Sequence, residues 1–299
     1  MSMRVATFNQ MSSVLELAMN TQARLAEVQE QEASGLVSSD YGGLETDAGT
    51  VVDLSVTIAR SNSLIDSAEL IASRTEMISA ALTEISDLLT NMRVAVNAVT
   101  SDEYLAELQT QAESYLEELS SILNTQYAGR YLFGGGETES EPVDISSYLA
   151  TDLTTVNTDY YLGDSYIQTC RLGTDLSIDY GVTADSEGIE MAMRALSYIA
   201  NSTTLSTDDL SDLSDLLVEA QDEVLALVTI SGNATNRIEN FIDSESSYVA
   251  ELEEIAAGMT SVDIAEAAVE ASAYETQLQA SYSAISVLTD LSLIDYLNL

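Results

Sequence analysis

A run of three glycines, Gly134-Gly135-Gly136, is the first feature of the sequence that could do chemistry, because glycine-rich loops can bind phosphate groups. A phosphate-binding loop of that kind also needs a lysine and a helix directly after the glycines. This chain contains no lysine, and an acidic segment with the only proline, Pro142, follows the run. The glycines therefore indicate a chain reversal at a structural boundary, and we expect no nucleotide there.

Four aspartates that lie close together in the sequence could ligate a cation, but their spacing is not that of a calcium-binding loop. Two hydroxyl residues, Ser206 and Thr207, come directly before them. Hydroxyls favour the position before a helix, and acids are stabilised in its first turn by the helix dipole. We therefore predict a helix start here and no metal site. The four acids are Asp208, Asp209, Asp212 and Asp215.

The sequence has few residues that could support nucleophilic catalysis. There is no histidine, which excludes Ser-His-Asp and Cys-His chemistry. The single cysteine, Cys170, lies beside Arg171, and it can form neither an intrachain disulfide nor a thiolate metal cage. A buried strand residue is the simpler interpretation of this thiol. We predict a protein that is not an enzyme and that uses no cofactor.

The charge balance bounds the partners of the chain. Fifty acids face nine bases, which gives a formal net charge of −41 over 299 residues. Such a surface repels phosphate backbones and anionic membranes, so we expect no nucleic acid and no membrane as partners. The amino terminus lacks the apolar core of a cleaved secretory signal. These features predict a cytoplasmic protein, unless the chain uses an export route without a cleaved signal.

Heptad patterns dominate the sequence outside the middle. Apolar residues recur every three or four positions from Leu213 to Met259 and from Leu64 to Val99. Thr100 to Glu103 has the spacing of a capping box and predicts the start of a further helix over 105–126. Exposed stripes need partners, so we predict that 64–99, 105–126 and 213–259 pack as an antiparallel bundle. The polar residues within one stripe, Ser231 and Glu245, either fix the helix register or face a gap between three helices.

Two further amphipathic helices are predicted at the termini, where glycine-containing segments separate them from the long helices. A helix of this length with nothing to cover its apolar stripe is marginally stable alone. The two helices can cover each other, but much apolar surface remains, and we expect it to contact other subunits. The predicted subunit-assembly residues are Phe8, Met11, Leu15 and Leu25 near the start, and Leu278, Tyr282, Ile285, Leu288 and Leu291 near the end.

The middle of the chain, 134–184, loses the helical period, and alternating tyrosine, isoleucine and threonine predict short strands between turns. We therefore expect a mainly α protein: a long antiparallel helical bundle or coiled coil with a small β-rich inserted domain and amphipathic terminal helices. The expected divisions are 1–44, 45–133, 134–184, 185–259 and 260–299. The boundary of the insertion is expected at Arg130, Tyr131, Leu132, Phe133, Gly134 and Gly135.

Two segments resemble the bacterial flagellin family: GRYLFGG, from Gly129 to Gly135, and LQASYSAISVLTDLSLIDYL, from Leu278 to Leu297. The LQASY and LSLIDYL pieces and the short insertion favour the branch of the family that joins the flagellar hook to the filament, hook-associated protein 3. The resemblance implies a secreted, non-enzymatic subunit of a ring. It implies export through the flagellar type III apparatus without a cleaved signal, and terminal helices that fold only on assembly.

The implied partners are identical subunits, the hook-side junction protein, flagellin, and an export chaperone on the carboxyl-terminal helix. A short flagellin that forms the filament itself is the alternative within the family. An intracellular coiled-coil scaffold is an alternative from another class, since it explains the heptads but not the motifs at both ends. We also hypothesise that two of the scarce arginines, Arg130 and Arg237, are structural tethers.

Overall fold

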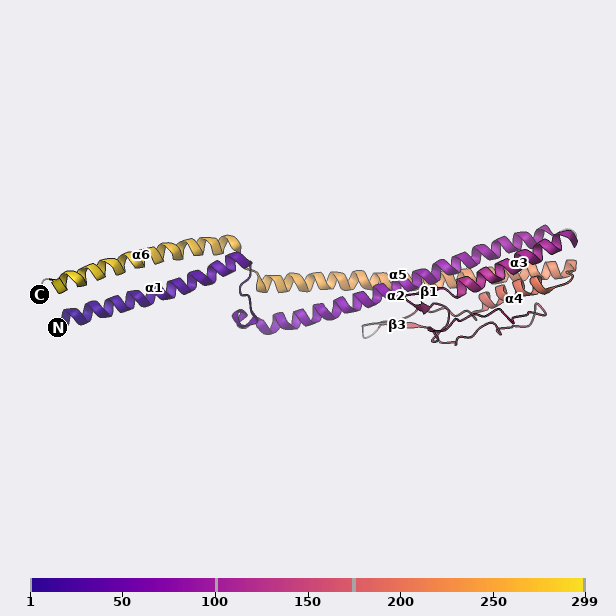
Figure 1. The fold of residues 1–299 in the computed structure, drawn as a ribbon, viewed down its shortest axis with the longest axis horizontal. Helices are drawn as coiled ribbons and strands as arrows, with labels where there is room; N and C mark the ends of the chain where they lie inside the picture. Colours follow the sequence, from indigo (N-terminus) through magenta and orange to yellow (C-terminus); the bar gives the residue numbers. More distant parts are fainter. Residues whose placement is uncertain (1, 100–101, 174–175, 298–299) are drawn as a thin grey trace. The chain divides into compact units, whose positions relative to one another are not determined.

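The structure is a computed structural model that describes residues 2–99, 102–173 and 176–297, and its described elements are mainly helical (Figure 1). The mainly α fold with small two-stranded sheets in the middle is confirmed. Thr100 and Ser101, which open the predicted capping box, lie outside the described residues. The helices are α1 (Ser2–Ser34), the 3₁₀ helix η1 (Tyr41–Leu44), α2 (Ala48–Ala98), α3 (Asp102–Leu123), α4 (Glu187–Asn201), α5 (Thr207–Thr260) and α6 (Ile264–Leu297).

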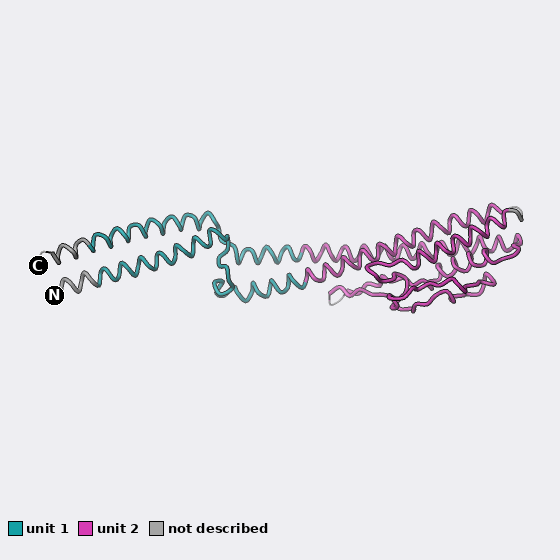
Figure 2. The backbone as a smooth tube through the Cα atoms, viewed as in Figure 1, with its two compact units in different colours: residues 1–60, 248–299 teal, residues 61–247 magenta. Residues whose placement is uncertain are grey.

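The chain divides into two compact units, which Figure 2 shows in different colours. One unit contains residues 1–60 and 248–299, and the other contains residues 61–247. The long helices α2 and α5 each contribute to both units, because each runs without a break across the division. We call residues 61–247 the bundle unit and residues 1–60 with 248–299 the terminal unit, and we describe each by itself.

The predicted heptad stripes form the core of the bundle unit. Ile78, Leu82 and Leu89 of α2 are fully buried, and so are Leu217 and Val224 of α5. Helix α3 adds its own buried stripe to the same cluster, as its sequence period predicts. Within this unit α2 and α5 run antiparallel and pack as a pair (Figure 1).

Polar residues in the stripes connect the two long helices by hydrogen bonds. The Ser231 hydroxyl donates to the carbonyl of Thr75 at 3.2 Å, and the Ser61 hydroxyl donates to the Glu245 carboxylate at 2.6 Å. The gap interpretation of these two positions is therefore wrong. The pair of side chains Ser61 and Glu245 favours one register, because a shift of one turn separates them, whereas Ser231 bonds a backbone carbonyl and is less specific.

Helix α4 was not distinguished in the sequence from the long helix that follows it. It starts after Ser186, and it ends near Ser202, well before α5 begins. Ile189, Met193 and Leu196 are fully buried, but so is most of the rest of the helix, including Glu190. Its polar residues Glu190, Arg194 and Ser197 recur every three or four positions, so the helical period is present in the sequence, but this polar face is buried as well.

The insertion contains two hairpins and a long irregular segment. Strands β1 (Gln126–Tyr127) and β2 (Arg130–Tyr131) form one antiparallel pair, and β3 (Thr169–Leu172) and β4 (Leu176–Asp179) form the other. The second hairpin covers α2 and α5 with Cys170, Leu172 and Ile178, which belong to one buried cluster with Ala68 and Ile238. Cys170 is 4% exposed, as predicted for a strand residue, and burial raises the pKa of its thiol.

Side-chain hydrogen bonds hold the irregular segment to the helices. The Asn124 amide at the end of α3 donates to the carbonyl of Val143 at 2.9 Å and accepts from its N–H at 3.0 Å. The Tyr160 hydroxyl donates to the carbonyl of Ala184 at 2.9 Å, and its ring packs edge-on against Tyr148. These bonds replace the ladder of a larger sheet, since buried backbone groups need partners.

In the terminal unit, α1 and α6 lie side by side and run antiparallel (Figure 1). Helix α1 ends at Ser34, and the next residue, Gly35, has the φ of +71° that glycine adopts after a helix C-terminus. The segment after it pairs with the break between α5 and α6: Val37 donates to the carbonyl of Thr260, and Val262 donates to the carbonyl of Gly35. This pairing gives α1 and α6 a common starting point for their contact.

Candidate functional site

The facing sides of α1 and α6 form a narrow two-helix seam. Ala18 and Val28 of α1 are buried, and so are Ala267 and Ala271 of α6. Thr21, also buried, donates its hydroxyl to the carbonyl of Leu17 one turn before it, so it needs no partner across the seam. Small side chains let the helices approach closely, but they bury little apolar area per residue. The seam therefore holds the pair together without the depth of a globular core.

The predicted assembly residues fall into three groups in the structure. Half-buried beside the seam are Met11, Leu25, Leu278, Ile285 and Leu288. Leu15 and Tyr282 lie away from the seam and are 50% and 51% exposed. The side chains of Phe8 and Leu291 lie outside the described residues.

A second set of apolar residues on the same helices faces solvent, and the sequence reasoning did not single it out. Leu17 and Met19 of α1 are each at least 60% exposed, and Val269 of α6 is 71% exposed. No charged residue lies between Glu275 and Asp290 of α6. Exposed apolar residues and a stretch without charge are both typical of a surface that is covered in an assembly. This set could have been found in the sequence, because α1 and α6 contain more apolar residues than a single heptad stripe accounts for.

At the predicted boundary of the insertion, Leu132 and Phe133 are fully buried in the main cluster, while Arg130 is exposed and Tyr131 is half-buried. Leu132 and Phe133 therefore anchor the chain where it leaves the helices. Gly134 and Gly135 follow them and are buried as well. At the boundary, two buried apolar side chains are therefore followed by glycines at which the backbone packs closely against the rest of the insertion.

The glycine run wraps around one carboxylate. The Asp164 side chain accepts hydrogen bonds from the N–H of Gly136 at 2.6 Å and of Tyr166 at 3.0 Å. Gly135 has a φ of +68°, and a Cβ at this position would overlap Asp164. The two N–H donors hold the pKa of the Asp164 carboxyl below its usual value. The run therefore binds a carboxylate of its own chain, which explains three glycines without any phosphate ligand.

An arginine tethers this boundary to α2, but it is Arg74 and neither of the two arginines hypothesised from the sequence. Its Nη2 donates to the carbonyl of Tyr131 at 2.9 Å. Neither Arg130 nor Arg237 forms a side-chain hydrogen bond or an ion pair with the residues that the structure describes. The sequence offered no signal for this choice, because Arg74 lies 57 positions from its partner.

A buried ion pair fastens another part of the insertion. Arg194 and Glu190 lie one turn apart on α4, with 3.0 Å between Nη2 and Oε2. Glu190 also accepts from the N–H of Asn157 at 2.8 Å, and Arg194 donates to the carbonyl of Leu153. Two buried charges are tolerated when they pair and form further hydrogen bonds, and here only the Nε of Arg194 is buried without a partner among the described residues. The pair consequently acts as a clamp on the loop around residues 153–157 and offers no free acid or base.

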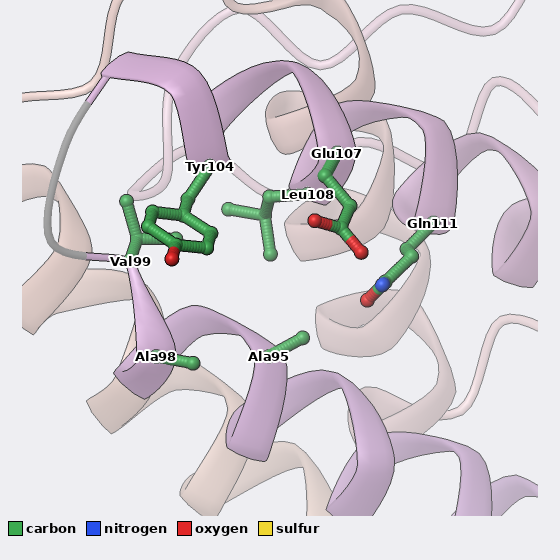
Figure 3. Close-up of a pocket in the computed structure, with 7 residues that line it drawn as sticks. All are labelled: Ala95, Ala98, Val99, Tyr104, Glu107, Leu108 and Gln111. Carbon is green, nitrogen blue, oxygen red and sulfur yellow. The ribbon is translucent and has the colours of Figure 1, made fainter.

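A small pocket lies between the end of α2 and the start of α3 (Figure 3). It has a volume of about 200 Å³, and its lining combines apolar side chains with one carboxylate, one amide and one phenol. A single unpaired carboxylate does not make an acid–base pair for catalysis. The lining residues are Ala95, Ala98, Val99, Tyr104, Glu107, Leu108 and Gln111.

A helix starts at Thr207, as predicted, and of the four aspartates Asp209 forms a cap with Ser206. The Ser206 N–H and hydroxyl both donate to the Asp209 carboxylate at 2.8 Å, and the Asp209 N–H donates back to the Ser206 hydroxyl at 3.1 Å. This reciprocal pairing lowers the pKa of the Asp209 carboxyl. Within the part of the chain that the structure describes, no three acid or cysteine side chains gather in a way that could hold a metal ion.

None of the described helices is both long enough and apolar enough to cross a membrane.

Two stretches of the sequence match family descriptions. Residues 5–138 match the bacterial flagellin N-terminal helical region, and residues 215–297 match the bacterial flagellin C-terminal helical region. No curated protein is similar enough in sequence to match the chain. The two matched stretches contain α1, α2 and α3 on one side and most of α5 with α6 on the other, so they include every long helix.

Three solved structures are similar to the chain at low identity. Flagellar hook-associated protein 3 from Legionella pneumophila is 13% identical, with 68% of this chain and 96% of that chain covered and a TM-score of 0.53. A flagellar hook-associated protein from Vibrio parahaemolyticus is 16% identical, with 74% and 99% covered and a TM-score of 0.45. Bacillus cereus FlgL is 16% identical, with 72% and 96% covered and a TM-score of 0.37.

Proposed function

Because the chain belongs to the bacterial flagellin family, we propose that it is the subunit that joins the flagellar hook to the filament. Members of this family are structural proteins and not enzymes, and the chain is a component of the flagellum. Its proposed place is outside the cell, in a ring of identical copies between the hook-side junction protein and flagellin. It reaches that place by flagellar export without a cleaved signal, with a chaperone on its carboxyl-terminal helix before export.

The observation that carries the proposal is the surface of the α1–α6 pair. The pair buries small residues at its seam and leaves Leu17, Met19 and Val269 exposed. In our proposal these helices complete their burial only against neighbouring copies, so folding of the ends and polymerisation are one event. The low charge of α6 between Glu275 and Asp290 supports such close packing, because the rest of the chain is strongly acidic.

Two features favour the junction over a short flagellin that forms the filament itself. The carboxyl-terminal LQASY and LSLIDYL segments and the short insertion resemble the junction branch of the family. The fold is also similar to the hook-associated protein 3 of Legionella pneumophila. An intracellular coiled-coil scaffold remains the alternative from another class, and it predicts that the protein stays in the cytoplasm.

Removal of the gene from the bacterium that encodes this chain tests the proposal. We expect hooks without filaments, and flagellin released into the medium, because the filament loses its attachment. The distribution of the protein in sheared flagella is measured alongside by quantitative mass spectrometry, where a junction subunit must be far rarer than flagellin. Filaments that stay attached in the deletion strain, or a copy number equal to that of the filament subunit, contradict the proposal.

A further inference from the structure

Arginine is the only strongly basic side chain in this protein, and few of its arginines are used within the fold. Among the described residues, only Arg194 has a side-chain nitrogen within 4.0 Å of a carboxylate oxygen. The chain contains 50 acids, so carboxylates are abundant on its surface. The arginines that pair with none of them are available for contacts with another molecule.

Two of these arginines lie near each other at the boundary of the insertion. Arg74 extends from α2 to the β1–β2 hairpin, where its Nη2 donates to the Tyr131 carbonyl at 2.9 Å. Arg130 directly precedes Tyr131 in β2, and its side chain is exposed. The Nε of Arg74 is buried and has no hydrogen-bond partner. Burial is the main cause that lowers the pKa of Arg74, and the nearby charge of Arg130 lowers it further.

Such a pair is unfavourable by itself. Like charges that lie side by side repel each other, and partial burial of one of them adds a desolvation cost. Tyr180, half-buried beside Arg74 and Arg130, offers a phenol but no negative charge at neutral pH, since its pKa is raised, chiefly by burial. An incoming anion offsets the repulsion, and the fork of a guanidinium binds a carboxylate through two parallel hydrogen bonds.

We propose that Arg74 and Arg130 form a binding site for a carboxylate side chain of a second copy of this chain. This inference rests on the proposed assembly function. The occupant follows from charge: every copy that packs alongside presents some of its 50 acids, and the repulsion between copies is lowest where such an acid meets a pair of cations. Arg74 is the positioning residue, fixed by its bond to Tyr131, and Arg130 is the accessible contact.

The anion specificity of the site is tested by NMR of the arginine Nε–H groups in the full chain, titrated with glutarate at constant ionic strength. We expect saturable shifts at Arg74 and Arg130. The matched controls are Arg60 and Arg237, exposed arginines on α2 and α5, and we expect no saturable shift there. Equal shifts at all four arginines, or none at all, overturn the proposed site.

The identity of the occupant is tested by sedimentation velocity over a range of protein concentrations. Arg130→Gln is expected to weaken self-association about fivefold, the usual scale for one well-placed charge pair, whereas Arg237→Gln leaves it unchanged. The circular dichroism spectrum checks the fold, which we expect to stay intact because Arg130 is exposed. Self-association that is unchanged in Arg130→Gln overturns the proposal. So does a wild-type chain that binds glutarate but remains monomeric at every concentration.

The gene deletion separates this inference from the function on which it rests. If the deletion leaves filaments attached, the junction function is wrong. If the deletion detaches them while Arg130→Gln self-associates like the wild type, the junction function stands and only the arginine site is wrong.

Discussion

The terminal helix pair and the bundle unit have similar heptad patterns in sequence but very different interiors. Between α1 and α6 the buried apolar cluster consists of Val28, Ala267 and Ala271. In the bundle unit, Leu89 and Phe133 are among many large side chains that are fully buried. The difference is the number of covering elements, because α3, α4 and the insertion add to α2 and α5, whereas among the described residues the buried cluster between α1 and α6 comes from these two helices alone. A heptad stripe therefore indicates that a helix needs a partner, and says nothing about where the partner comes from.

The two regions also differ in how they satisfy polar groups. The buried or hydrogen-bonded carboxylates with a lowered pKa, such as those of Asp164 and Asp209, lie in the bundle unit. There, hydrogen bonds such as that from Gln221 to Thr90, at 2.7 Å, also cross between the long helices. On α1 and α6, the hydroxyls of Thr21 and Thr289 donate instead to carbonyls of their own helix. The seam of the terminal pair therefore relies on apolar contact alone, which other copies can extend.

The largest expected effect is on the free energy of unfolding, when one leucine from each region is replaced by alanine. Leu89→Ala leaves a cavity in a filled core and should lower the free energy of unfolding by about 2–5 kcal/mol. Leu25→Ala removes a half-buried side chain from the terminal pair and should cost about 1 kcal/mol or less. Urea unfolding followed by circular dichroism measures both. Equal losses for the two variants contradict the difference between the regions.

A smaller effect on stability distinguishes two reasons for glycine at the edge of the insertion: a positive φ, and lack of space for a Cβ atom. Gly129 and Gly135 both have positive φ, at +76° and +68°, but only Gly135 approaches Asp164. Gly129→Ala therefore measures the cost of the backbone conformation alone. Gly135→Ala should cost about 1–2 kcal/mol more, because the new methyl group overlaps a fixed neighbour. Thermal unfolding gives the comparison, and equal melting temperatures argue against a close crossing at this point.

The smallest expected effect is a change in stability with pH that depends on Asp152. The N–H groups of Thr154 and Thr155 lower the pKa of Asp152 to about 2, below the roughly 3.9 of an unfolded chain. The sign follows: this carboxylate stabilises the fold above about pH 4, and the contribution disappears as the pH falls toward 2. Asp152→Asn should therefore be less stable than the wild type near neutral pH, with a difference that shrinks in acid. A difference that is constant with pH removes this explanation.

Much of the fold could be predicted because its longest helices have a polar face and an apolar face. The stripe of α5 was identified over nearly its whole length and that of α2 from Leu64 onward, although α2 begins at Ala48, and the terminal helices were found as well. The prediction of which residues face the partner helix was less accurate where apolar residues occur on more than one side of a helix. On α1, Val14 and Thr21 face α6 more than Leu15 does, and the apolar residues Leu17 and Met19 make the period ambiguous.

The packing of the helices was predicted, but individual side-chain contacts between distant residues were not. The clamp of Glu190 and Arg194 on the insertion, and the bond from Arg74 to Tyr131, depend on how a loop folds back over the helices. The irregular insertion has no regular period, and the polar stripe of α4 does not indicate which loop covers it. The glycine run was correctly interpreted as a boundary, but its partner, Asp164, lies 28 residues away from Gly136.

Hydrogen exchange of the free chain and of assembled flagella tests most directly whether the terminal helices are incomplete alone. In the free chain, we expect backbone amides of α1 and α6 to exchange much faster than those around Leu82 of α2 and Leu217 of α5, because a two-helix seam opens easily. In the assembled state, the same terminal amides should become protected. Terminal helices that are as protected in the free monomer as the bundle core, with no gain on assembly, contradict the account.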